Sequence, residues 1–593
     1  MLQLDHLSFH IDKDGEPFPL LDEVSLDIPT GHFMAIVGPS GCGKTTLLKT
    51  IAGINPETAG TLSYNDRNLA EDGDFEPHEI GYVPQFSIAY DELTVDESIE
   101  TAAKLRIQSQ SNAEIDNRLD RILSETGMTE IADRSVKVLS GGQKRRLGLA
   151  MELVSSPKLL LCDEVTSGLD PRSEREIVAL LHQLSRNDER IVISVTHSLA
   201  DLDLYDSVLV LHEGRVTYHG PPSGIGHYFS VENNEEIYPS LAKRPSQDWK
   251  LSWKKRRLQY EEKLIHAAEQ RRQATQKALA EKQKEEEKDS DTQELADKKY
   301  EWKPLPAVVE APSFIAQVAT LLSRRLRIFT RDRSQVILQL ALIIGFPLLV
   351  SLFSPRANEQ AQRLSNSMAE NQMVELVTRA EVRESRLKVG SANSGIIMFE
   401  IVLLCLIGSN NSAREIAGER RIYEKEKFGG LSPAAYLTSK LTFLSILILV
   451  QSLWMGFFVE MFWEFPGNFG NHLLFLVLVN AAMTSVCLGI SAMAKNAEQS
   501  SLLSIYLVGF QLPLSGAILA LPEAVEPLTR PFISAYWAWS GSVSSLATDT
   551  FAAVKGTTET ALSTSNNCLY LLGAHLIIGL AAALIGLQKP RWD

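Results

Sequence analysis

A glycine-rich stretch near the amino terminus has the residue types and spacing of a phosphate-binding loop. It lies between an apolar run, 33–37, and a stretch with helical character, 46–51. Glycines let successive backbone N–H groups surround phosphate oxygens, while a lysine reaches the β- and γ-phosphates and a hydroxyl ligates Mg²⁺. The residues of this predicted nucleotide site are Gly38, Pro39, Ser40, Gly41, Cys42, Gly43, Lys44, Thr45 and Thr46.

Two adjacent carboxylates, Asp163 and Glu164, follow a second apolar run, 158–162. Water attack on a γ-phosphate needs a positioned metal ion and an oriented water molecule. The pair therefore predicts that Asp163 serves Mg²⁺ and that Glu164 polarises the attacking water. The alternative interpretation is a strand that ends in two solvated acids.

A second glycine-rich turn, Ser140, Gly141, Gly142 and Gln143, directly precedes a helical stretch, 144–154. A serine hydroxyl and glycine amides at a helix start form an anion-binding cup. One bound nucleotide does not need two such cups.

The elements that must position these residues are short runs of β-branched and apolar residues, 33–37, 158–162 and 190–196, that alternate with amphipathic stretches. This alternation is typical of buried parallel strands between helices. It predicts an α/β nucleotide-binding domain over residues 1–232.

The order and spacing of these motifs resemble the ATP-binding cassette (ABC) family. In that family, the LSGGQ cup of one subunit closes over the nucleotide held by the other. By resemblance, Gln85 is the Q-loop glutamine, Asp170 lies in the D-loop at the dimer interface, and His197 is the switch histidine. The implied fold is a P-loop domain with a RecA-like core and a helical subdomain.

The resemblance implies ATP and Mg²⁺ as cofactors. It implies roles in hydrolysis for Lys44, Gln85, Glu164 and His197, and metal ligation by Thr45, Gln85 and Asp163. Two positions depart from the family pattern. Val165 replaces the usual proline, and Ile11 stands where an aromatic residue would stack on adenine, so Phe9, His10 or Phe18 would have to substitute.

The rest of the chain is expected to pass from water into the membrane. A charge-dense segment over 233–312 is expected to be a helical linker, and 313–334 an amphipathic helix on the cytosolic membrane face. Residues 335–593 are expected to be an all-α membrane domain of six spans, with external loops at about 355–390 and 522–568. The expected spans are 335–354, 391–411, 438–459, 472–493, 500–521 and 569–588.

The distribution of basic residues predicts how the spans are oriented in the membrane. The connection 412–440 carries six of them, whereas 460–471 carries none, so the first is expected to be cytosolic and the second external. The amino terminus lacks the pattern of a signal peptide. The protein is therefore expected in the cell membrane, which in a bacterium is the inner membrane, with the cassette and both termini in the cytosol.

The domain order resembles the half-transporters of the G (White) subfamily and their bacterial relatives with type-2 permeases. This implies an ATP-driven exporter or lipid floppase of hydrophobic or amphipathic molecules, with membrane lipid as a further partner. A half-transporter needs a second chain, and the intact motifs favour an identical one. Cassette closure would act through 412–437 to turn the cavity outward.

Two other functions stay open. One is a regulatory or mechanotransmission ATPase, which would act on a partner protein without carrying a substrate. The other is an importer, although importers generally keep cassette and permease on separate chains. The net charge of −15 argues against nucleic acid, and the scattered cysteines (Cys42, Cys162, Cys405, Cys487 and Cys568) argue against zinc and disulfide chemistry.

Within the spans, Glu400 is a carboxylate where charge is costly. It is expected either to bind a cationic substrate or couple protons, or to pair internally or sit hydrated near the outer interface. By resemblance, 515–519 would form an apolar valve. Cys568 is expected to be external, as a free thiol or as a bridge between protomers.

Overall fold

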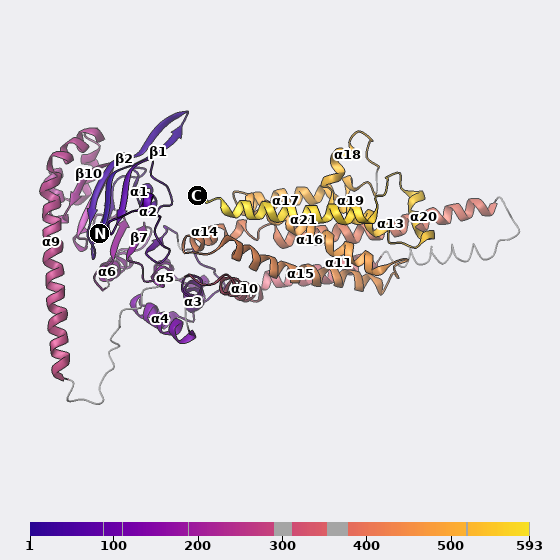
Figure 1. Cartoon of the computed structure of the whole chain (residues 1–593), viewed down its shortest axis with the longest axis horizontal. Coiled ribbons are helices and arrows are strands. Elements are labelled where there is room, and N and C mark those ends of the chain that lie inside the picture. The colour runs from indigo at the N-terminus through magenta and orange to yellow at the C-terminus, as the bar shows by residue number, and fades with distance from the viewer. Residues whose placement is uncertain are drawn as a thin grey trace. The chain divides into compact units, whose positions relative to one another are not determined.

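The computed structural model describes residues 1–86, 88–108, 111–187, 189–289, 311–352, 377–517 and 520–591 (Figure 1). The chain divides into two compact units. The first consists of Met1–Ala316 with Phe428–Gly430, and the second of Gln317–Lys427 with Leu431–Asp593.

The strands all belong to the first unit. They are β1 (Leu2–Lys13), β2 (Glu16–Ile28), β3 (Phe33–Val37), β4 (Ala59–Tyr64), β5 (Arg67–Asn68), β6 (Ile80–Val83), β7 (Leu159–Asp163), β8 (Ile191–Val195), β9 (Ser207–His212) and β10 (Arg215–Gly220). Its helices are α1 (Lys44–Ile51), α2 (Leu69–Asp72), α3 (Val95–Arg106), α4 (Asn112–Glu125), α5 (Gly141–Leu153), α6 (Pro171–Asn187), α7 (Pro222–Phe229), α8 (Ile237–Leu241) and α9 (Ser246–Asp289), with short 3₁₀ turns between them.

A six-stranded sheet in the order β10-β9-β3-β8-β7-β6 forms the core of this unit, and its strands are parallel except β10. Every residue of β3, β7 and β8 is buried, as the apolar runs predict for strands covered on both faces. The three predicted strands are confirmed, with β7 extending to the first carboxylate. Because the strands are parallel, the loops after β3, β6, β7 and β8 leave from one edge of the sheet.

Two smaller parts complete the first unit. An antiparallel sheet in the order β2-β1-β4-β5 carries the amino terminus. Helices α3, α4 and α5 share a separate apolar core, which corresponds to the expected helical subdomain.

The packed part of the first unit extends beyond residue 232, where the sequence analysis ends the cassette. The first half of α9 lies along β10 (Figure 1), and Trp249, Trp253, Tyr260 and Leu264 are all less than 10% exposed. These residues share one helical face because their spacing is four and seven. The dense charges around them conceal this aromatic stripe. Residues 290–310 of the expected linker lie outside the described residues.

The second unit is helical. Its helices are α10 (Phe314–Arg331), which begins just before the unit boundary, α11 (Arg333–Ser351), α13 (Val377–Ser412), α14 (Arg420–Phe428), α15 (Pro433–Glu460), α16 (Phe469–Met493), α17 (Ala497–Gln511), α18 (Glu526–Thr529), α19 (Ser534–Val543), α20 (Thr548–Thr557) and α21 (Ser565–Gln588). The long helices α13, α15, α16 and α21 run beside one another (Figure 1).

Five described helical stretches are long and apolar enough to cross a membrane, and they contain α11, α13, α15, α16 and α21. The fifth expected span, 500–521, differs. Its helix α17 has 15 residues and ends before Pro513, which cannot donate a backbone hydrogen bond. A span of ordinary length needs about 20 residues.

The expected external loop 522–568 contains folded structure. Helix α19 is almost wholly buried, and its Trp539 is 0% exposed and donates through Nε1 to Ser394 Oγ at 3.0 Å. A helix of ten residues is too short for a hydropathy window of membrane length, so the pattern conceals it. Cys568 is also buried, in the core of this unit, and is a free thiol. Most of the other expected loop, 355–390, lies outside the described residues.

The helix expected at 313–334 is present as α10, but its arginines do not all face outward. Arg324 forms an ion pair with Glu426, and Arg325 lies 2.8 Å from Glu415. Lys440 bridges Glu415 and Glu419 at 2.9 and 2.6 Å. These buried pairs join α10 to the basic connection 412–440 and to α15 within the second unit.

Candidate nucleotide-binding site

The loop between β3 and α1 has the conformation that glycine permits. Gly43 has a φ of 102°, and a Cβ atom on it would lie 2.8 Å from the carbonyl oxygen of Leu20. Gly38 has a φ of 154°, and its Cβ would overlap the carbonyl of Leu211. Lys44 is buried, and its Nζ donates to the carbonyl oxygens of Gly38 and Pro39 at 2.9 and 3.0 Å. The lysine ammonium therefore lies inside the loop that would surround the phosphates.

The first carboxylate lies beside the loop threonine. Thr45 Oγ1 donates to Asp163 Oδ1 at 2.9 Å, so two of the three predicted metal ligands are brought together, while the third, Gln85, contacts Glu164. Tyr82, a buried residue of β6, donates through its hydroxyl to Asp163 Oδ2 at 3.2 Å. Burial raises the pKa of Asp163, although the hydrogen bonds from Thr45 and Tyr82 oppose this.

Tyr82 is a site residue that the sequence analysis missed. Burial and the charge of Asp163 raise its pKa, so the phenol stays a hydrogen-bond donor. The only signal in the sequence is its place on an apolar run, three residues before Gln85. Its contact with Asp163 depends on the pairing of β6 with β7, which the sequence does not specify.

The second carboxylate lies between the two residues that the family resemblance singles out. Gln85 Nε2 donates to Glu164 Oε2 at 2.7 Å, and His197 Nε2 lies 2.6 Å from Glu164 Oε1. Glu164 has a φ of 47°, a left-handed conformation that non-glycine residues seldom adopt. Such strain is concentrated at functional sites. The sheet edge therefore gathers Gln85, Glu164 and His197, which lie on three different loops.

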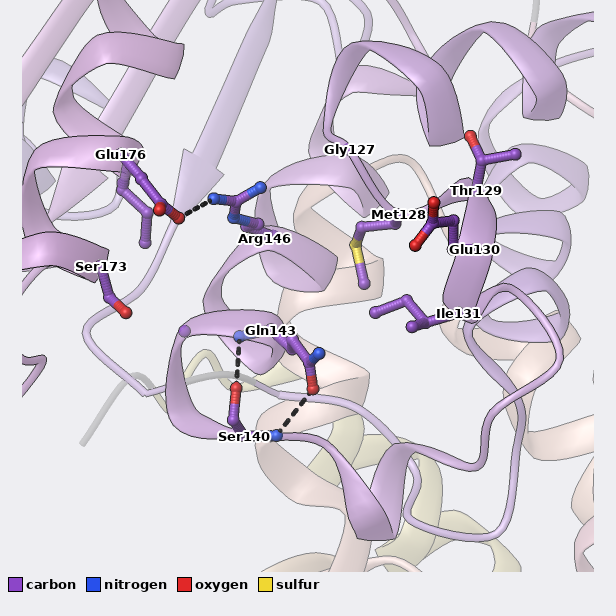
Figure 2. A pocket seen from close by; sticks show the side chains of 12 residues that line it. Gly127, Met128, Thr129, Glu130, Ile131, Ser140, Gln143, Arg146, Ser173 and Glu176 are labelled. Atoms are coloured by element: carbon purple, nitrogen blue, oxygen red, sulfur yellow. Dashed lines mark hydrogen bonds and ion pairs between the residues drawn. The ribbon is translucent and has the colours of Figure 1, made fainter.

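The second glycine-rich turn begins helix α5. Ser140 is the N-cap residue: its Oγ accepts the Gln143 N–H at 3.3 Å, and Gln143 Oε1 accepts the Ser140 N–H at 3.0 Å (Figure 2). Because the serine oxygen accepts here, its own O–H can still donate to an anion. The turn opens on a cavity of about 490 Å³, across which Arg146 pairs with Glu176 at 2.6 Å.

The cavity and the loop after β3 are built from different parts of the chain. The residues around the cavity are Gly127, Met128, Thr129, Glu130, Ile131, Ser140, Gly142, Gln143, Arg146, Ser173, Glu176 and Ile177. Asp170, the expected D-loop residue, accepts the Ser173 N–H at 3.0 Å and so caps α6, and Gly141 is exposed at the start of α5. The two anion-binding cups are therefore separate surfaces of one unit.

The position of the missing adenine-stacking residue is on the β1–β2 hairpin. Ile11 pairs directly with Phe18, and the Phe18 ring is 46% exposed with Lys13 Nζ 5.2 Å from its centroid. Phe9 and His10 pair with Leu21 and Pro19. Of the three candidates, Phe18 is the large apolar side chain that is exposed at this position. Its role in base recognition stays a prediction.

The residues at the sheet edge fit Mg²⁺–ATP. They offer a glycine cradle with a buried ammonium, a hydroxyl beside a carboxylate, and a second carboxylate held by an amide and an imidazole. This donor set is that of a P-loop ATPase.

Comparison with known proteins agrees with this class. Residues 21–167 match the ABC transporter family, and residues 316–537 match the ABC-2 type transporter family. The ABC transporter ATP-binding/permease protein Rv1747 of Mycobacterium tuberculosis is 29% identical over 90% of this chain and 56% of its own length. The energy-coupling factor transporter ATP-binding protein EcfA1 of Levilactobacillus brevis is 34% identical over 38% of this chain and 80% of its own length.

Among solved structures, a dimeric post-hydrolysis state of the ATP-binding cassette MJ0796 bound to ADP and Pi is similar at 27% identity. It covers 37% of this chain and 99% of its own, with a TM-score of 0.34. The chain spans little more than half of the first curated relatives that it matches, 56% of the Rv1747 protein and 59% of a sulfate/thiosulfate import protein.

The chain belongs to the ABC transporter family, and it joins an ATP-binding cassette to an ABC-2 type membrane domain. This combination is that of a type-2 half-transporter. Its cassette binds ATP, and its apolar helices make it a multi-pass membrane protein. Membership of the G subfamily stays a prediction.

Proposed function

We propose that the chain is an ATP-driven exporter, or lipid floppase, of hydrophobic or amphipathic molecules, and that it acts as a dimer. The observation that carries this proposal is the separation of the two anion-binding cups. Lys44 and Thr45 belong to the sheet edge, whereas Ser140 opens on a different cavity of the same unit. A nucleotide held by one chain would therefore be enclosed by Ser140 of a second chain.

The residues of the sheet edge have distinct tasks in this proposal. Lys44 neutralises the β- and γ-phosphates, while Thr45 and Asp163 hold Mg²⁺, which offsets the charge of the phosphates. Glu164 orients the attacking water and accepts its proton, and His197 contacts the γ-phosphate. In the structure, Gln85 and His197 occupy the two oxygens of Glu164. Each of these oxygens keeps a further lone pair that can accept a hydrogen bond from the attacking water.

Two identical chains would suffice, because each carries a complete set of motifs. A C2 arrangement would place each Ser140 over the partner's loop and create two equivalent sites. The proposed transmission runs through the connection 412–437, where Glu415 and Glu419 are held by Arg325 and Lys440. These pairs would let the connection, α10 and α15 move as one body.

The proposed orientation in the membrane follows from the basic residues, whereas the proposed export direction rests on the presence of cassette and permease in one chain. The basic connection 412–440 would lie in the cytosol, with the cassette and both termini, in the inner membrane of a bacterium. Hydrophobic or amphipathic molecules would leave the cytosol or the inner leaflet. The six-span topology is part of this proposal, with α17 as the shortest span.

The test is ATP turnover by the full chain alone in lipid nanodiscs, with Glu164→Gln as the blank. Turnover above the blank supports a self-sufficient dimer. Candidate lipids and hydrophobic cations are then added in turn, and those that change the rate are tested for ATP-dependent movement in vesicles.

Two results would contradict the proposal in different ways. Equal turnover in the chain and the blank would indicate that another chain is needed. Turnover without movement of any tested lipid or cation would favour the regulatory ATPase instead.

A further inference from the structure

A carboxylate and an imidazole face each other inside the membrane domain. Glu400 of α13 is 0% exposed and His472 of α16 is 2% exposed. His472 Nε2 lies 3.1 Å from Glu400 Oε2. Glu400 is thus paired internally, as one of the two expectations has it, and its partner can itself carry a proton.

Each member of the pair keeps one polar atom without a hydrogen bond. Glu400 Oε1 and His472 Nδ1 are both buried and have no partner among the described residues. The Phe465 ring stacks on the imidazole with centroids 4.4 Å apart and an interplanar angle of 9°. Both atoms can therefore form a hydrogen bond with water when the site is hydrated.

Few other charges act on the pair. Glu460, at the end of α15, is the other charge that bears on Glu400, and its Oε2 accepts the Phe465 N–H at 3.0 Å. No group of three or more His, Cys, Asp or Glu is found among the described residues, so the pair lacks the ligands of a metal site.

Ionisable side chains on the other helices around α13 and α16 are engaged elsewhere or exposed. Lys440 pairs with Glu415 and Glu419, His575 contacts Ser534 and the carbonyl of Pro531, and the Tyr536 hydroxyl donates to Ala561. On the other helices the exposed ones are Glu498, Tyr506, Asp549, Lys555 and Tyr570, and on α13 itself Arg383, Glu384, Arg386 and Lys388 are exposed.

The charge of the pair depends on the number of protons that it holds. With one proton it is neutral overall, either as two neutral groups or as an ion pair. A second proton makes it a cation, and the loss of the first makes it an anion. A net charge is costly in a buried site, and the cost falls when water enters. The number of bound protons is therefore tied to whether the site is closed or hydrated.

The pair lies close to one end of the helical unit. His472 is the fourth residue of α16, directly after the connection 460–468 that carries no lysine or arginine. In the proposed topology this connection is external. Opening of the domain toward the outside would hydrate the pair from that side, while the buried residues Leu404, Leu476 and Val479 follow on the same two helices toward the other end.

We propose that Glu400 and His472 form a proton-binding site that exchanges with the outer aqueous phase when the membrane domain opens. The site takes up a second proton in the outward-open state and releases it before the domain closes. Outer acidity thus shifts the balance between the two states and changes the rate of the cycle. This inference rests on the proposed exporter topology.

The test uses the full chain in proteoliposomes with the cassettes facing outward, so that the lumen corresponds to the outer phase. The pH around the cassettes is held constant, and the lumen is set between about pH 5.5 and about pH 8, the range in which imidazole titrates. We expect ATP turnover to change by at least about threefold over this range. In Glu400→Gln and in His472→Gln, the response to lumen pH should disappear.

A matched control is Glu460→Gln, which removes the neighbouring carboxylate and should keep the response. Infrared spectra give a readout that does not need turnover: the absorption of a protonated carboxyl, of an imidazolium or of both should rise as the pH falls, and the carboxyl absorption should be absent in Glu400→Gln. If Glu400→Gln fails to fold, His472→Gln carries the same test.

Two outcomes would overturn the inference. One is ATP turnover that does not vary with lumen pH, together with carboxyl and imidazolium absorptions that both stay constant. The other is a lumen response that survives in both Glu400→Gln and His472→Gln. A chain without turnover at any pH would contradict the exporter proposal instead, and the infrared titration would still decide whether the pair binds protons.

Discussion

Replacement of Glu164 by glutamine should separate catalysis from binding. Glu164 Oε2 accepts a hydrogen bond from Gln85 Nε2 at 2.7 Å, and Glu164 Oε1 lies 2.6 Å from His197 Nε2. An amide has nearly the same shape but only one accepting oxygen, so one of these contacts is lost when His197 donates through Nε2. That loss should cost about 1 kcal/mol of stability. The amide cannot accept the proton of water, and removal of a general base typically costs about 10²- to 10⁴-fold in rate, or about 3–5 kcal/mol.

The assay measures turnover and nucleotide affinity on the same sample in nanodiscs. We expect turnover to fall by about 10²-fold or more, with ATP affinity within about threefold of the original, because Lys44, Thr45 and Asp163 are unchanged. The control is Glu16→Gln, an exposed carboxylate on the β1–β2 hairpin. The reasoning is refuted if Glu164→Gln keeps more than about a tenth of the turnover, or if it loses ATP binding in proportion.

Three further predictions concern stability. Burial lowers the pKa of His219 to about 3, below its ordinary value of 6.5. The free energy of unfolding of the first unit should therefore fall by about 1.4 kcal/mol per pH unit below about pH 6. His219→Leu should flatten the dependence of the melting temperature on pH, whereas His6→Asn, at an exposed position, should not. Gly43→Ala should destabilise the first unit by about 1–3 kcal/mol and abolish ATP binding, since its φ is 102° and a Cβ would meet Leu20; Gly41→Ala, whose Cβ meets nothing within 4 Å, should cost less. Trp253→Ala should cost about 3–5 kcal/mol and expose α9 to proteolysis, because the indole is 4% exposed and lies 5.7 Å from Tyr218, whereas Leu258→Ala, at a side chain that is 75% exposed, should do neither.

The nucleotide site was predictable because its chemistry is local. The loop from Gly38 to Thr45 lies between one strand and one helix, so its spacing along the chain is also its spacing in space. Asp163 and Glu164 end a buried strand, and parallel strands bring their carboxyl ends to one edge. Tyr82 escaped prediction because its contact with Asp163 crosses two strands.

The end of the cassette and the form of the membrane domain were harder to predict. Trp249 and Trp253 lie in a segment whose average composition is that of a solvated helix, yet they pack against Tyr218 and Tyr228 and so help to join α9 to the first unit. Helix α19 is apolar but too short for a hydropathy signal. In both cases the decisive contacts are with residues distant in the sequence.

The sequence by itself determined the class of this protein, because phosphate chemistry needs particular residue types at short, fixed spacings and because long apolar runs need a membrane. Tertiary structure alone decided which polar side chains meet. The contacts of Glu164 with Gln85 and His197, and of Glu400 with His472, join loops or helices that lie 33 to 79 residues apart. Helix rotation and strand order set these distances, and a linear pattern contains neither.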